Sequence, residues 1–123
     1  MLTVKSNLSF EECERRIKER IKTMGLTIFS EIDHSKNARE VGLQLNNTKL
    51  ILFGNPRVGT LVMQDDQKIG YELPLRVLIW ENSEGVFVSG KLVSEIAKEY
   101  DIKKTEIVKK MDEVVNTIMN SCS

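Results

Sequence analysis

The chain has 123 residues, a length typical of one domain, and its 18 Lys and Arg residues balance its 18 Asp and Glu residues. Hydrophobic residues make up 41% of the chain, which argues against disorder, and the lack of a basic excess argues against binding to a nucleic-acid backbone. We therefore expect a single domain over residues 1–123 with no nucleic-acid partner.

The first half of the chain alternates short strands with helices. The pattern Ser-x-x-Glu beginning at Ser9 is a capping box, which predicts the start of a helix. Apolar residues then recur at steps of three and four as far as Gly25, which ends the helix because glycine enters the left-handed conformation at little cost. The other elements predicted here are strands at 3–5, 26–32 and 49–53 and a short helix after Asp33.

The second half ends in the most regular helix of the chain. Asn55 followed by Pro56 predicts a short helix that runs toward residue 67. A tight loop joins the strongest strand, at 75–81, to a strand at 86–88, and helices follow near 93–100 and over 107–122. The order is β-α-β-α-β-α-β-β-α-α, which predicts an α+β fold with a mainly antiparallel sheet of about five strands.

The cysteines and the start of the chain bear on location. The first residues do not have the basic and apolar regions of a signal peptide, and the longest apolar runs are far shorter than a membrane span. Cys13 lies on the apolar stripe of the first helix, so we expect a buried and unreactive thiol. Two cysteines without a secretory signal do not indicate a disulfide, so we expect a reduced, cytoplasmic protein with no membrane partner.

Residues 54–60 form the first candidate site. The segment follows an apolar strand and opens a helix, where free amides can hold an anion or a carboxylate. Arg57 would add charge, Thr60 a hydroxyl, and Gly59 close approach, although the Gly-Lys-Ser/Thr ending of a phosphate-binding loop is missing. The same residue types are also typical of a plain turn in which Asn55 caps the helix.

The pair Asp33-His34 forms the second candidate site. His34 is the only histidine, so acid–base chemistry near neutral pH would most simply use it, with Asp33 or Glu81 as its orienting carboxylate. The competing interpretation is that Asp33 or Ser35 caps the next helix and His34 is a solvated turn residue. One histidine and two distant cysteines are too few for a zinc site, and we expect neither a metal nor a cofactor.

The phrase Phe53-Gly54-Asn55-Pro56, followed after two residues by Gly59-Thr60, is specific. Around it stand Asp33-His34, Ala38, Gly42-Leu43, Thr48, Met63, Leu73-Pro74-Leu75 and Trp80-Glu81. In these residues, over roughly positions 25–90, the chain resembles the domain-of-unknown-function 302 family. It departs from the family at Leu61, where the pattern has proline. The resemblance implies a curved sheet carrying helices and pairing into a homodimer, and it implies no particular reaction.

Both candidate sites follow apolar strands and precede helices. We therefore expect Asp33, His34, Asn55 and Thr60 to line one recess, in which a cytoplasmic homodimer binds a small polar or anionic molecule without catalysis. A second hypothesis is an enzyme with His34 as general base. A third is an interaction module that uses strand 77–80 and the apolar stripe of the last helix as partner surfaces.

Overall fold

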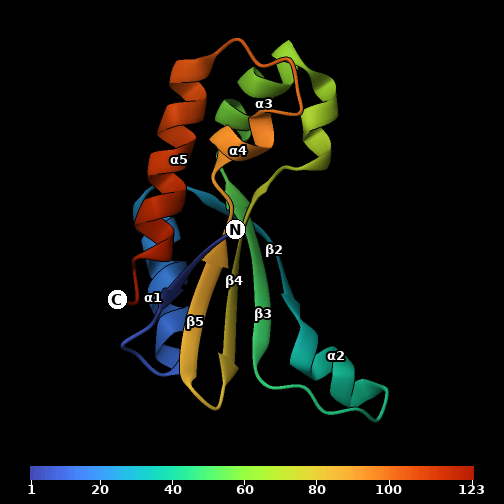
Figure 1. Ribbon diagram of the computed structural model, residues 1–123, viewed down its shortest axis with the longest axis vertical. Helices are drawn as coiled ribbons and strands as arrows, with labels where there is room; N and C mark the ends of the chain where they lie inside the picture. The colour runs from blue at the N-terminus through green and yellow to red at the C-terminus, as the bar shows by residue number, and fades with distance from the viewer.

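The fold is built on one sheet whose strands all run antiparallel to their neighbours (Figure 1). The computed structural model describes residues 1–123. Its strands are β1 Leu2–Lys5, β2 Thr27–Asp33, β3 Thr48–Gly54, β4 Leu75–Asn82 and β5 Gly85–Gly90. Its helices are α1 Phe10–Thr23, α2 His34–Glu40, α3 Pro56–Asp65, α4 Val93–Ala97 and α5 Thr105–Met119, with a 3-10 helix η1 at Gln67–Tyr71. The predicted α+β class and element order are confirmed, and only η1 lies outside the prediction.

The strand order is β1-β5-β4-β3-β2. Strands β2 to β5 therefore pair in chain order, each with the next, and the N-terminal strand β1 completes the sheet beside β5. In the register, Ile51 lies opposite Val77, and Ile79 lies opposite Val88, so these four side chains share one face. All four are buried, which makes this the core face of the sheet.

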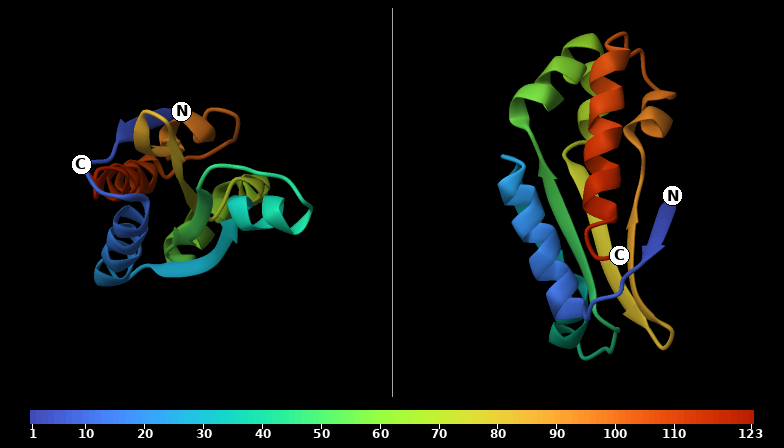
Figure 2. Two further views of the ribbon diagram at one scale, coloured as in Figure 1. Left: turned by 90° about the horizontal axis from the view of Figure 1, so that it is seen from below. Right: turned by 90° about the vertical axis from the view of Figure 1, so that its left-hand side faces the viewer.

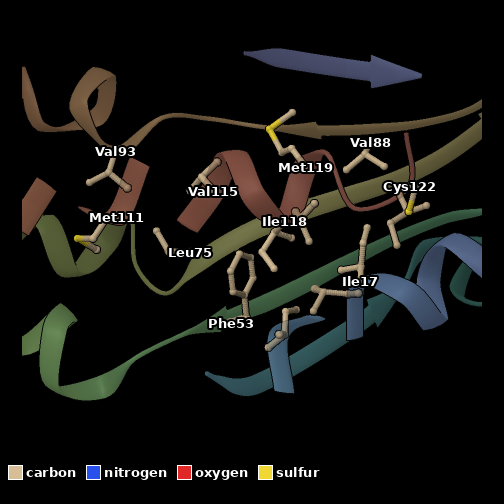
Figure 3. Packing of buried hydrophobic residues seen from close by; sticks show 14 of the residues in the cluster. Ile17, Phe53, Leu75, Val88, Val93, Met111, Val115, Ile118, Met119 and Cys122 are labelled. Carbon is tan, nitrogen blue, oxygen red and sulfur yellow. The ribbon is translucent and has the colours of Figure 1, made fainter. Parts of the chain in front are cut away.

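Helices α1 and α5 pack side by side on the core face (Figure 2). Their apolar stripes are the ones that the sequence predicts: Ile17 and Ile21 of α1 and Ile118 of α5 have no exposed surface. Ser9 caps α1 by accepting a hydrogen bond from the amide of Glu12, which is the expected start of that helix. The close view in Figure 3 shows Ile118 between the two helices and the sheet, near Ile17.

Two ion pairs tie α1 to the sheet: Glu14 pairs with Lys49 on β3, and Lys18 pairs with Glu31 on β2. The Glu14 carboxylate lies 2.7 Å from Lys18 Nζ and 2.8 Å from Lys49 Nζ on β3. Burial raises the pKa of Glu14, but the hydrogen bonds and charges of Lys18 and Lys49 outweigh it, so the pKa lies below its usual value of 4.5. The carboxylate is therefore charged in the folded state over the whole neutral range.

The two cysteines form a disulfide, so the expectation of free, unreactive thiols is wrong. Cys13 of α1 and Cys122 beyond the end of α5 are bonded, with their Cα atoms 5.4 Å apart. The expectation failed because the residues that follow α5 turn back onto α1, which brings positions 109 residues apart into contact. Intracellular disulfides are uncommon, so the bond removes the support that free thiols give to a reducing, cytoplasmic location.

The second face of the sheet is only partly covered. Leu50, Leu78 and Trp80 belong to this face and are half-buried, while α2 lies beside it at the β2–β3 end (Figure 2). Trp80 is therefore not a core residue: its ring stacks on Phe87 with centroids 4.7 Å apart, and its Nε1 donates to the Ser89 hydroxyl at 2.8 Å. No helix of the chain combines the length and the apolar character that crossing a membrane requires.

Candidate functional site

The two predicted site segments lie at opposite ends of the β2–β3 pair, so the expected common recess does not exist. Thr27 pairs with Gly54, whereas Asp33 pairs with Lys49. The two ends are six residue steps apart along β2, a distance of about 20 Å at 3.3 Å per residue. Because β2 and β3 are antiparallel, their carboxyl ends point in opposite directions, and the helices that follow them begin on opposite sides of the molecule.

At the first end, Asp33 acts as the cap of α2. Its Oδ1 accepts hydrogen bonds from the Lys36 amide at 3.0 Å and from the Ser35 hydroxyl at 2.8 Å. These bonds, the backbone one foremost, hold the pKa of Asp33 below its ordinary value. The carboxylate is thus occupied by its own helix, as the capping interpretation predicts, and it does not hydrogen-bond to His34.

Glu81 does not orient His34 either. Its Oε1 accepts a hydrogen bond from the Asn47 side-chain amide at 2.9 Å, and its backbone amide donates to the Asn47 carbonyl at 3.0 Å. These two hydrogen bonds therefore link Asn47, the residue before β3, to β4. His34 stands exposed at the first position of α2, so the carboxylate–histidine pair that the enzyme hypothesis needs is not assembled.

At the other end, Asn55 and Thr60 serve α3. Asn55 Oδ1 accepts from the Arg57 amide at 2.9 Å and from the Val58 amide at 3.5 Å, and Pro56 occupies the first helical turn. The Thr60 hydroxyl donates to the Pro56 carbonyl at 2.7 Å. Arg57 is exposed on the same helix and does not reach the cavity described next. The polar side chains of this segment are therefore committed to the helix itself.

A cavity of about 390 Å³ lies beside α3, and most of its wall is apolar. Phe53 at the end of β3 and Leu75 at the start of β4 contribute to the wall next to Met111 of α5; Figure 3 shows these three side chains close together. Val58, Gly59 and Met63 of α3 line another part, and the segment Leu73–Pro74, joined by a cis peptide bond, lines a third. Three separate parts of the family phrase thus meet around one space.

Gly59 matters because it leaves room in this cavity. A Cβ atom at Gly59 would lie 3.9 Å from Leu73 Cδ1 and 3.9 Å from Met63 Cε, which is ordinary contact rather than collision. Any larger side chain would extend among residues that line the cavity. The volume of the cavity therefore depends on glycine at this helical position, where glycine itself weakens the helix.

Phe29 stands at the mouth of the cavity because of an irregularity in β2. The register between β2 and β3 shifts between Ile28 and Ser30, which leaves Phe29 as the extra residue of a bulge. Its ring lines the cavity and lies 4.0 Å from the place of a Cβ on Gly54, yet 47% of its surface is exposed. An exposed aromatic ring at a cavity mouth is available to a ligand.

Lys110 of α5 is the one charged residue that lines the cavity. It is exposed and takes part in no ion pair. The cavity therefore offers an apolar interior with a single cation, and no group of three His, Cys, Asp or Glu side chains in the chain is placed to hold a metal ion.

Sequence reasoning found the α3 part of this site and missed the rest. Asn55, Gly59 and Thr60 line the cavity, whereas Asp33, His34, Arg57 and Glu81 do not. The residues missed are Phe29, Met111 and Lys110. The phrase Leu73-Pro74-Leu75 could have indicated a wall of the cavity. For α5, the only signal in the sequence is its apolar stripe.

Several known proteins are similar to this chain, some in sequence and one in fold. Over 85 residues, or 69% of the chain, it is 45% identical to two proteins called fluoride-specific ion channel FluC 1, from Brucella suis biovar 1 (strain 1330) and Brucella abortus biovar 1 (strain 9-941). The chain spans about a third of the length of these relatives, 34% and 32%.

A solved structure confirms the fold. The crystal structure of an uncharacterized conserved DUF302 protein from Bacillus stearothermophilus has a TM-score of 0.88 to this chain at 16% identity, and the match covers 99% of this chain and 97% of that one. The family model described as domain of unknown function DUF302 matches residues 2–118, well beyond the region over which the resemblance is first visible. The chain therefore belongs to the DUF302 family.

Proposed function

We propose that the protein binds a small amphipathic anion, without catalysis, in the cavity beside α3. The observation that carries the proposal is the composition of the wall, which is mostly apolar and has Lys110 as its sole charged residue. The apolar wall calls for an apolar ligand body, and the lysine calls for an anionic group at one end. The sequence led us to expect a polar ligand that contacts Asn55 and Thr60. We now propose an amphipathic ligand instead, because those two side chains make hydrogen bonds within α3.

The size of the cavity sets the size of the ligand. A volume of 390 Å³ lies in the range of small-molecule sites. At the loose packing of a bound ligand it accommodates roughly a dozen non-hydrogen atoms, such as a medium-chain fatty acid or an aromatic carboxylate with an alkyl group. Phe29 at the mouth and Phe53 in the wall provide aromatic contact for such a body.

The match to part of the channel proteins supports a separable binding unit. Residues equivalent to this chain make up 34% of the Brucella suis protein, so the same domain is joined there to other sequence. Binding domains are commonly attached to unrelated activities, whereas the fold alone does not specify what is bound. We therefore base the proposed binding role on the cavity and not on the similarity to the channel proteins.

Decanoate is a suitable probe, with decylamine as its cationic counterpart. A ligand that binds the native state raises the melting temperature by mass action, so decanoate is expected to raise it and decylamine to raise it less. In Gly59→Leu the new side chain fills the cavity, and the response to decanoate should disappear. An equal response in wild type and Gly59→Leu, with both variants folded by circular dichroism, would refute the assignment of the site.

We further propose that the chain pairs with a second copy through the arm formed by α2 and the loop after it. Val41, Leu43 and Leu45 are 71%, 65% and 50% exposed, and Figure 1 shows this segment projecting from the body of the molecule. Clustered exposed apolar side chains are typical of interfaces. Light scattering should give twice the chain mass, and Leu43→Lys should give the monomer; Tyr71→Lys, at another exposed apolar residue, is the matched control.

A further inference from the structure

A second cleft lies on the partly covered face of the sheet, away from the cavity beside α3. It has a volume of about 300 Å³. Leu50 of β3 and Leu78 of β4 are the half-buried apolar residues beneath it, and His34 of α2 and Ile96 of α4 stand at its margins. The cleft thus lies between the start of α2 and the short helix α4, with sheet side chains from two strands as its base.

Two cations meet in this cleft. Arg76 lies on β4, and Lys91 directly follows β5. The β4–β5 pairing ends at Leu78 and Ser89, and Arg76 and Lys91 each lie two residues beyond that last pair, where both line the cleft. Like charges brought near each other at the ends of neighbouring strands repel. The arrangement is unfavourable for the empty fold and favourable for an anion between the two side chains.

The two cations of the cleft are not held in ion pairs. Neither Arg76 nor Lys91 belongs to any of the ion pairs in the structure. The one acidic residue in the cleft is Glu72, whose Oε2 accepts a hydrogen bond from the Tyr100 hydroxyl at 2.7 Å. Arg76 and Lys91 outnumber Glu72, and the N-terminal residue Met1 also lines the cleft, so the cleft carries an excess of positive charge.

We propose that this cleft is a second binding site, for a small organic anion such as an aromatic carboxylate. The guanidinium of Arg76 presents paired donors that match the two oxygens of a carboxylate, and Lys91 adds a second cation. The apolar body of the ligand packs on Leu50 and Leu78, with His34 at the far margin.

The two sites call for different ligands. The cavity beside α3 is mostly apolar and contains one lysine, whereas the cleft carries two cations on a short apolar base. The cleft shares Leu75 with the cavity, but its cations come from β4 and the end of β5. The second site therefore does not depend on the function proposed for the first.

Benzoate is the probe that tests the cleft, and benzylamine is its cationic control. In a titration followed by amide chemical shifts, benzoate should cause saturable shifts at Leu50, Leu78 and Lys91, and benzylamine should cause none there. Arg76→Gln removes one cation from an exposed position without altering the core, and it should weaken benzoate binding about fivefold or more.

Lys110→Gln, which removes the cation of the other site, is the matched control and should leave benzoate shifts in the cleft unchanged. Absence of saturable shifts in wild type would overturn the proposal. Equal affinity of wild type and Arg76→Gln would also overturn it, because Arg76 would then make no contribution to binding. Shifts that appear only around Gly59 and Met63 would overturn it too, because they would place benzoate in the cavity beside α3.

Discussion

Loss of the Cys13–Cys122 disulfide is expected to destabilise the protein strongly. The bond joins residues 109 positions apart, so it closes nearly the whole chain into a loop. On the loop-entropy model a closed loop of this length contributes about 4.7 kcal/mol at 25 °C, and measured losses for native disulfides run from about 2 to 5 kcal/mol. With an unfolding entropy of about 2.1 cal/mol/K per residue, a loss of about 2 to 5 kcal/mol lowers the melting temperature by roughly 8–19 °C.

The assay compares oxidised and reduced protein by thermal unfolding. Both sulfurs are buried, with Cys13 0% and Cys122 2% exposed, so the bond should be reduced in denaturant and the protein refolded in the presence of a reductant. Reduced wild type keeps the packing of both residues and reports the cross-link alone. Cys13→Ala with Cys122→Ala also loses packing, and it serves as the control whose melting temperature does not respond to reductant.

Two outcomes would refute this reasoning. The first is a melting temperature that does not differ between oxidised and reduced wild type, which would mean that the contact between α1 and the C-terminal turn stabilises the fold without the bond. The second is the recovery of two free thiols from protein unfolded without reductant. The same thiol count, made on protein trapped in its native host, tests whether the compartment is oxidising.

Three further predictions concern the cavity and the ion pairs. Gly59→Ala should raise the free energy of unfolding by about 0.5–1 kcal/mol, because alanine favours helix, while weakening decanoate binding; destabilisation in urea unfolding would contradict the open space seen at this position. Lys110→Gln should weaken decanoate up to about fivefold without changing the melting temperature, and Lys109→Gln, its neighbour outside the cavity, should change neither. The lowered pKa of Glu14 means that its stabilising charge is present above pH 4.5 and lost as the pH falls through the lower value in the folded state, so the urea midpoint of wild type should drop there more than that of Glu14→Gln.

Local patterns were sufficient to predict the elements of this fold. The cap at Ser9, the stripe that includes Ile17 and Ile21, and the tight loop between β4 and β5 are signals contained within a few residues, and each corresponds to a feature of the structure. The family phrase around Asn55 likewise predicted the turn that starts α3. These features depend on backbone and side-chain chemistry that acts over short distances along the chain.

The disulfide and the cavity mouth depend on tertiary placement, and local patterns did not predict them. Cys122 meets Cys13 only because the residues after α5 turn toward α1. Phe29 reaches the cavity only because the β2–β3 register shifts by one residue, which turns the side chain away from its alternating position. Lys110 lines the cavity because α5 packs against α3 and β4.

The antiparallel pairing of β2 with β3 explains why residues of one family motif lie in two separate parts of the molecule. A family phrase orders residues along the chain, so Asp33-His34 and Asn55-Pro56 look like parts of one site after two similar strands. The pairing reverses one strand and sends the first pair to the cleft side and the second to the cavity beside α3. Leu75 lines both spaces, so the start of β4 is the wall between them. A change at Leu75 should therefore alter both binding sites at once, whereas changes at Gly59 and Arg76 should each alter one.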